Sequence, residues 1–130
     1  MSDIKKYWRN YINGEWVDAE NGGRIEIENP ATGGIIAEVA RAQKDDIDRA
    51  VAAARACFES RELYNMRPTN RGQLMFDIAR HLTEMADEIA LAECLDNGKT
   101  LAGGKNEAMA AARYFTYYGG LADKLEGRMI

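Results

Sequence analysis

The spacing of apolar residues changes from period two to a helical period near residue 43, and this change constrains the fold more than any other feature. Before it, residues 24–28 alternate charged and apolar side chains, as a half-buried strand does. After it, apolar residues recur at spacings of three and four, as on one face of a helix. The sequence therefore predicts β-ribbons over residues 1–42 and helices over residues 43–130.

Two turn motifs divide the first part into hairpin-like ribbons. Asn13-Gly14 stands between two short apolar segments, which is the strongest short signal of a hairpin with a two-residue turn. The second ribbon joins strands over 24–28 and 35–40 through a break that begins at Asn29-Pro30. Isolated ribbons of this kind are only marginally stable, so we expect them to pack on another part of the protein.

Four helices are predicted in the second part. Their starts and ends follow from capping residues, from apolar spacing and from the glycines that end helices. The first begins at Lys44 and carries Ile47, Ala50, Val51, Ala54 and Phe58 on one face; the second has its N-cap at Thr69 and carries Leu74, Ile78 and Leu82; the third runs from about Ala86 to Leu95 and is apolar nearly all round, hence buried; the fourth runs from near Gly104 to Glu126, with helix propensity interrupted at Gly119-Gly120.

Acidic residues gather where the first helix is expected to begin. Asp45, Asp46 and Asp48 lie in or near its first turn, where the positive end of the helix dipole favours carboxylates. The alternative is a paired-carboxylate acid/base site, which needs a cleft that the sequence does not indicate. We therefore interpret these residues as stabilising the helix start.

The cysteines and the single histidine do not form a metal or disulfide pattern. Cys57 and Cys94 lie far apart and lack CxxC spacing, so we expect small buried apolar side chains rather than nucleophiles. His81 has no second histidine or ligand cluster beside it, which favours an exposed or hydrogen-bonded side chain over a catalytic one.

Glycine pairs and clustered aromatic residues offer two further candidate sites. Gly22-Gly23, Gly33-Gly34 and Gly103-Gly104 fit neither GxGxxG nor GxxxxGK[ST], so phosphate binding by them is not expected. The aromatic cluster is interpreted as packing anchors rather than a ligand cage, because aromatic residues around a helix more often pack. Its members are Tyr114, Phe115, Tyr117 and Tyr118.

Charge and hydropathy exclude two classes of partner. The net charge is −4 and the basic residues are dispersed among more numerous acidic ones, which argues against binding to nucleic acid or to an anionic membrane. No apolar run reaches the length of a membrane-spanning helix, and the first residues lack the pattern of a signal peptide. A cytoplasmic protein is expected.

Short motifs in a fixed order resemble the opening of NAD(P)-dependent aldehyde dehydrogenases. Each is weak alone, but their joint order and spacing cover nearly the whole chain. The motifs are Tyr11-Ile12-Asn13-Gly14-Glu15-Trp16, Asn29-Pro30-Ala31-Thr32-Gly33, Asp46-Ile47-Asp48-Arg49-Ala50-Val51-Ala52-Ala53-Ala54, Arg71-Gly72, Leu95-Asp96-Asn97-Gly98-Lys99, and the stretch from Tyr114-Phe115 to Ala122-Asp123-Lys124.

The resemblance implies an oligomeric α/β enzyme with a Rossmann-like cofactor domain, which oxidises aldehydes to acids with NAD or NADP. Residues 1–130 would form the N-terminal part of that domain, without the Rossmann-like sheet and without the catalytic domain. The family's nucleophilic cysteine, general-base glutamate, oxyanion-stabilising asparagine and cofactor loops lie downstream, and Cys57 and Cys94 match none of them. No catalytic or cofactor-binding residue is therefore expected here, and the chain alone should be inactive.

One family site is expected in part. Many members hold a monovalent cation, Na⁺ or K⁺, by backbone carbonyls, and the matching positions here are Ile27, Glu28 and Asp96. The alternative is a turn and a helix end that simply touch.

A second function remains open beside the enzyme fragment. The expected partners of the fragment are the remainder of its chain and further copies of the complete protein. Alternatively, the chain is a non-enzymatic interaction or structural module whose uncovered apolar helix faces bind another polypeptide, since such patches mark interaction sites.

Overall fold

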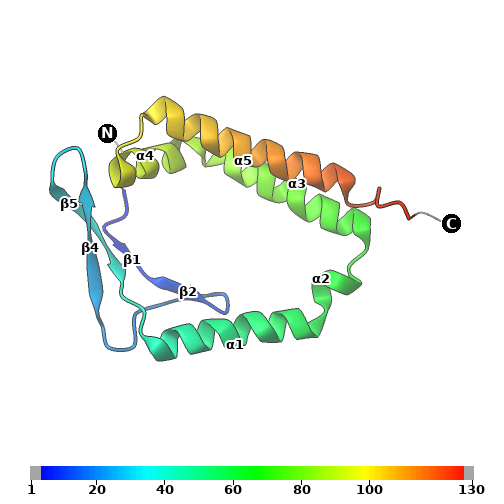
Figure 1. Cartoon of the computed structure of the whole chain (residues 1–130), viewed down its shortest axis with the longest axis horizontal. Coiled ribbons are helices and arrows are strands. Elements are labelled where there is room, and N and C mark those ends of the chain that lie inside the picture. Colours follow the sequence, from blue (N-terminus) through cyan, green and yellow to red (C-terminus); the bar gives the residue numbers. More distant parts are fainter. Residues whose placement is uncertain (1–3, 128–130) are drawn as a thin grey trace. The chain divides into compact units, whose positions relative to one another are not determined.

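The computed structural model describes residues 4–127, and Figure 1 shows strands first and helices after them. These residues form two compact units, residues 4–62 with 95–98, and residues 63–94 with 99–127. The change from strands to helices at Gln43 confirms the predicted change of period. The strands are β1 (Tyr7–Trp8), β2 (Asn10–Ile12), β3 (Glu15–Val17), β4 (Arg24–Asn29) and β5 (Gly34–Ala40), and the helices are α1 (Lys44–Ser60), α2 (Glu62–Asn65), α3 (Pro68–Glu84), α4 (Ala86–Asn97) and α5 (Leu101–Leu121).

The first ribbon is the predicted hairpin. Strands β2 and β3 pair antiparallel, with Ile12 opposite Glu15 across a two-residue turn. The turn residues have φ of 53° at Asn13 and 83° at Gly14. Positive φ at both positions is the signature of a type I′ turn, whose twist matches that of the strands. The prediction from Asn13-Gly14 is therefore confirmed.

A three-stranded sheet in the order β1-β5-β4 contains the second ribbon. Strands β4 and β5 form the predicted antiparallel pair. Strand β1 adds a parallel pair that the sequence analysis missed, with Tyr7 opposite Glu38. The backbone N–H of Glu38 also donates to the carbonyl of Lys6 at 2.9 Å. A two-residue strand is too short to produce a detectable apolar period, which explains the omission.

Helix α1 is anchored by a carboxylate in its first turn. The side chain of Asp46 is fully buried and accepts hydrogen bonds from the backbone N–H of Gln43 at 2.8 Å and of Glu20 at 3.2 Å. Its second oxygen pairs with the guanidinium of Arg49 at 2.6 Å. The predicted role at the helix start is confirmed for Asp46, which also ties the helix to the loop after β3.

Most of the large apolar side chains on the predicted face of α1 are exposed. Ile47, Val51 and Phe58 are 53%, 60% and 75% exposed. Helices in globular proteins bury such a stripe against a core. The sequence thus predicts the helix correctly, and the structure leaves its apolar face open to solvent.

Helices α3 and α5 lie side by side and antiparallel in Figure 1, and they make the most extensive helix–helix contact among the described residues. Small residues allow this close approach. The buried positions are Gly72 and Ala79 on α3, and Gly104, Ala108, Ala112 and Gly119 on α5.

Several predicted helix boundaries and burial states are wrong. Helix α3 begins at Pro68 after an N-cap at Arg67, so Thr69 lies inside the first turn instead of capping it. Proline is favoured there because the first helical N–H needs no partner. Helix α5 begins at Leu101, capped by Thr100, and ends at Leu121. In α4 only Ala86 and Ala90 are buried, so the expectation of a buried helix holds in part.

The predicted continuation of the last helix through Gly119-Gly120, despite their low helix propensity, is confirmed, because both glycines lie inside α5. The short helix α2 was not predicted, since four residues are too few to show a period. Within residues 4–127, no helix is both long enough and apolar enough to cross a lipid bilayer.

Candidate functional site

The candidate cation site begins at an irregularity in the β4–β5 ladder. Ile27 pairs with Ala37, whereas Glu28 pairs with Ile35, so Ile36 is an extra residue in β5. A bulge of this kind interrupts the regular hydrogen bonding and redirects neighbouring backbone groups. The backbone of Ile27 and Glu28 therefore departs from regular pairing at the two positions that the sequence analysis selected.

The turn after β4 is held by the buried side chain of Asn29. The side-chain Oδ1 of Asn29 accepts a hydrogen bond from the backbone N–H of Ala31 at 2.9 Å. The backbone carbonyl of Asn29 accepts one from the backbone N–H of Gly33 at 2.8 Å. Gly33 has a φ of 69°, which a residue with a β-carbon adopts only with strain. These contacts fix the direction in which the chain leaves β4.

The end of α4 touches this turn. Asp96 lies in the last turn of α4, and Gly98 follows with a φ of 77°, the left-handed conformation predicted for Asp96-Asn97-Gly98. A β-carbon on Gly98 would lie 3.3 Å from Cγ of Pro30. The structure therefore brings the corner at residues 95–98 against the turn beside Ile27 and Glu28.

Backbone carbonyl oxygens are the cation ligands that such a corner offers. Alkali cations are held in proteins by groups of carbonyl oxygens. Among residues 4–127, no cluster of three or more His, Cys, Asp or Glu side chains is placed to hold a metal ion. Both earlier interpretations, a carbonyl cation site and a plain contact between turn and helix end, fit this geometry.

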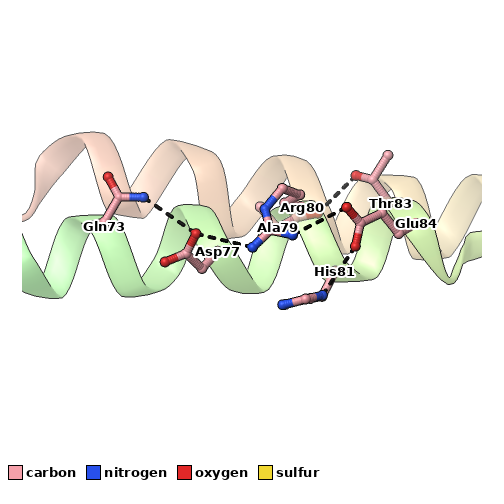
Figure 2. A network of polar contacts seen from close by, with 7 residues as sticks. All are labelled: Gln73, Asp77, Ala79, Arg80, His81, Thr83 and Glu84. Carbon is pink, nitrogen blue, oxygen red and sulfur yellow. Dashed lines mark hydrogen bonds and ion pairs between the residues drawn. The ribbon is translucent and has the colours of Figure 1, made fainter.

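His81 belongs to a polar network along α3, which Figure 2 shows, and the charged side chains of this network are exposed. Its Nδ1 lies 3.2 Å from a carboxylate oxygen of Glu84. Arg80 contacts the same carboxylate at 3.3 Å and that of Asp77 at 3.4 Å. The hydrogen bond with Glu84 holds the pKa of Arg80 above its usual value. The prediction of an exposed or hydrogen-bonded histidine is confirmed by the exposure of the side chain, which is 62%.

The expectation for Cys57 is wrong and that for Cys94 holds in part. Cys57 is exposed on α1, whereas Cys94 is half-buried on α4. Cys57 directly precedes Phe58, whose side chain on the apolar face of α1 is also exposed. Local apolar patterning therefore predicts helix here but not burial.

Three of the four aromatic residues in the α5 cluster are exposed, whereas Phe115 is half-buried. Tyr114, Tyr117 and Tyr118 are 67%, 62% and 56% exposed. Tyr117 and Tyr118 contact each other edge to face at 5.2 Å between ring centres. With Ala110 and Arg113 they line a shallow surface hollow. Their expected burial is therefore wrong for these three tyrosines.

The third glycine pair has a structural explanation. The N–H of Gly103 donates to Oγ1 of the N-cap Thr100 at 3.1 Å. A β-carbon on Gly104 would lie 3.0 Å from Cα of Ala90. Gly103 therefore binds the capping side chain of Thr100, and Gly104 allows close packing on α4.

The other two glycine pairs lie at turns. Gly22 has a φ of 68°, and Gly23 donates to the side chain of Asn21 at 2.9 Å. Gly33-Gly34 closes the turn between β4 and β5. All three pairs thus have roles in the fold that do not involve a phosphate.

Lys99 forms a charged bridge that the sequence analysis missed. Its ammonium lies 3.0 Å from Glu93 and 2.5 Å from Glu107. The hydrogen bond that Lys99 donates to Glu107, and next the one that it donates to Glu93, raise the pKa of Lys99. These partners stand six and eight residues away, so no helical spacing indicates them.

Arg71 is a second missed positioning residue. Its guanidinium donates to the carbonyls of Leu63 and Tyr64, each at 3.3 Å, and of Met66 at 2.8 Å. These carbonyls belong to α2 and to the connection after it, where helix-end carbonyls lack helical partners. The arginine thereby fixes the connection from α2 to α3.

Comparisons with known proteins give a consistent result. A sequence model described as "Aldehyde dehydrogenase family" matches residues 16–130. An aldehyde dehydrogenase of Alternaria alternata is 42% identical over 121 residues, which are 92% of this chain and 24% of the relative. The cytosolic 10-formyltetrahydrofolate dehydrogenase of Xenopus laevis is 41% identical over 122 residues, 92% of this chain and 13% of the relative.

Solved structures give the same picture. Betaine aldehyde dehydrogenase of Staphylococcus aureus, solved as a mutant in complex with NAD⁺, has a TM-score of 0.87 and 38% identity, covering 94% of this chain and 24% of the other. An NAD-dependent aldehyde dehydrogenase of Sinorhizobium meliloti has a TM-score of 0.89 and 33% identity, covering 96% of this chain and 25% of the other. The chain thus spans about a quarter or less of these relatives.

Proposed function

Because the chain belongs to the aldehyde dehydrogenase family, we propose that it is the N-terminal part of an NAD(P)-dependent enzyme that oxidises aldehydes to carboxylic acids. The observation that carries this proposal is a match in both sequence and fold over more than nine-tenths of the chain. The relatives named above include enzymes described as aldehyde dehydrogenases and one described as NAD-dependent.

The described residues would contribute a scaffold to that enzyme. The antiparallel pair α3–α5 and the sheet β1-β5-β4 each bring small or apolar residues together. A bound nicotinamide cofactor would supply the acceptor for a hydride. The glycine pairs at residues 22–23, 33–34 and 103–104 match no phosphate-binding motif, and they lie in turns or helix contacts. We propose that residues outside 4–127 hold the cofactor.

The turn after β4 and the corner after α4 would provide a monovalent cation site in the enzyme. The backbone carbonyls of Ile27, Glu28 and Asp96 would be its ligands from this chain. The bulge at Ile27/Glu28 and the contact between Gly98 and Pro30 support this proposal. A bound Na⁺ or K⁺ would fasten the corner to the turn.

The partners and location of the complete protein are part of the same proposal. The remainder of an aldehyde dehydrogenase chain would supply the nucleophile, the general base and the cofactor loops, and the complete protein would form a homo-oligomer. We place it in the cytoplasm. The names of the matching relatives include both a cytosolic and a mitochondrial 10-formyltetrahydrofolate dehydrogenase.

The test uses the natural polypeptide that an antibody against residues 63–94 recognises in cells. We expect a polypeptide several times longer than 130 residues, which forms NADH or NADPH when an aldehyde is added. The 130-residue chain expressed alone is the matched control, and it should give no signal above a boiled sample. A natural product of only this length, or turnover by the control, would contradict the proposal.

The open face of α1 supports a second function, binding to another polypeptide. Ile47, Val51 and Phe58 form an exposed apolar stripe along this helix. If the chain acts alone, this stripe would bind a second copy or a complementary fragment. Sedimentation and the fluorescence of an apolar dye separate the cases: a monomer that binds little dye would argue against the interaction module.

A further inference from the structure

The segment before β1 places one ammonium group over two indole rings. Nζ of Lys5 lies 4.8 Å from the ring centre of Trp8 and 4.9 Å from that of Trp16. A cation within about 6 Å of an aromatic centre is attracted by the negative face of the ring. Other cations in the described chain lie over one ring, as Arg24 does over Tyr7. The arrangement at Lys5 is therefore a two-walled cation site.

Both walls are held in place by the fold. Trp8 lies on β1, and its Nε1 donates to the carbonyl of Lys5 at 3.1 Å. Trp16 lies on β3 and contacts its cross-strand neighbour Tyr11 with ring centres 4.9 Å apart. The type I′ turn at Asn13-Gly14 fixes that pairing. The two indoles are thus positioned by backbone pairing rather than by the lysine alone.

The site is open to solvent. Trp16 is 53% exposed, Tyr11 is 61% exposed and Trp8 is half-buried. Lys5 itself is exposed, so a flexible side chain is all that separates the indole faces from a dissolved cation. Packing of the strands does not require the ammonium, because the β2–β3 and β1–β5 pairs are made by backbone groups.

We propose that Trp8 and Trp16 form a binding site for an organic ammonium cation, which the side chain of Lys5 occupies as a built-in ligand. A small tetraalkylammonium ion suits the site because it is weakly hydrated and carries its charge on an apolar surface, which is why aromatic walls recognise such ions. Lys5 competes with the external cation, so neutralising Lys5 opens the site. The aldehyde dehydrogenase assignment is not needed for this inference.

The sequence supplies a direct readout, since its two tryptophans are the two walls. Incorporation of 5-fluorotryptophan gives one ¹⁹F resonance for each wall, and Trp16→Phe assigns them. The chain, Lys5→Ala and Lys5→Arg are each titrated with tetramethylammonium chloride at constant ionic strength. Parallel titrations use tert-butyl alcohol, a neutral molecule of similar shape. Lys5→Gln serves as a second neutral variant if Lys5→Ala does not fold.

We expect both resonances of Lys5→Ala to shift with tetramethylammonium and to remain unshifted with tert-butyl alcohol. The apparent Kd should be about two- to fivefold lower than in the unaltered chain or in Lys5→Arg, which keep the competing cation. Adding Trp16→Leu to Lys5→Ala should abolish the shift at Trp8. Equal responses to the charged and the neutral probe, or equal Kd with and without Lys5, would overturn the proposal.

Discussion

A β-carbon on Gly72 would lie 2.7 Å from the carbonyl oxygen of Gly119, so α3 and α5 meet backbone to backbone at this point. The reverse contact is as close, because a β-carbon on Gly119 would lie 2.8 Å from Cε1 of Phe76. Neither position has room for a side chain. Gly119 lowers the helix propensity of α5, and it is therefore also the residue that allows the two helices to pack.

Gly72→Ala should destabilise the chain relative to Gly120→Ala. Both substitutions raise helix propensity by a similar amount. Nothing lies within 4 Å of a β-carbon at Gly120, whereas at Gly72 it would strike a backbone atom. Overpacking typically costs about 1–3 kcal/mol, and we expect the two free energies of unfolding, measured in urea, to differ by about that amount. Equal stabilities would show that α3 and α5 do not approach so closely.

Helix positions were more predictable than helix contacts, and Gly119 shows why. Apolar spacing is a local property, so it located α1, α3, α4 and α5 within a few residues. A glycine lowers helix propensity wherever it stands, and only the partner helix reveals that Gly119 is needed. The exposure of Phe58 and Tyr114 was missed for the same reason, since no local pattern states which surface is covered.

Thr100→Ala should cost about 0.5–2 kcal/mol, whereas Thr69→Ala should be nearly neutral. Oγ1 of Thr100 accepts the N–H of Gly103 at the start of α5. Loss of such an N-cap removes the partner of one unpaired helix N–H. Thr69 follows Pro68 inside the first turn of α3, where a capping side chain is not required. Unfolding in urea measures both variants, and Thr100→Ser should retain most of the stability. A larger loss at Thr69 would contradict the boundary of α3.

The candidate cation site could be predicted only through the family resemblance. Backbone oxygens of Ile27, Glu28 and Asp96 leave no side-chain signature, and the bulge between β4 and β5 has no marker in the alternating pattern. By contrast, the turn at Asn29 and the αL residue Gly98 follow from residue type. The sequence alone thus predicts the two loops but not their contact.

Asp46→Asn should lower stability at neutral pH and remove one source of acid sensitivity. The N–H of Gln43, and next that of Glu20, hold the pKa of the Asp46 carboxyl below its ordinary value of 3.8. A lowered pKa in the folded state means that the carboxylate stabilises the fold fully above pH 3.8 and that this contribution is lost as the pH falls through the folded-state pKa.

The measurement is the midpoint of urea unfolding as a function of pH. The difference between the unaltered chain and Asp46→Asn should be largest at neutral pH and should shrink below pH 3.8. Asp48→Asn is the matched control, because that carboxylate is exposed and pairs only at the surface with Lys44. A difference that stays constant with pH would show that the effect of Asp46→Asn does not come from its charge.

The double substitution Val51→Ser and Phe58→Ser should have opposite consequences in the chain alone and in a longer protein. In the chain alone both side chains are exposed, so the free energy of unfolding should change by less than about 0.5 kcal/mol for each, while binding of an apolar dye should fall. In a longer aldehyde dehydrogenase, as proposed above, the rest of the protein would cover the apolar face of α1. There the same substitutions would remove buried apolar groups, and each would lower the free energy of unfolding by about 2–5 kcal/mol. Glu59→Ser, on an exposed position of α1, controls for changes in helix propensity. Equal effects in the two contexts would mean that the face of α1 stays open in the longer protein, and its role would then lie in contacts with another chain.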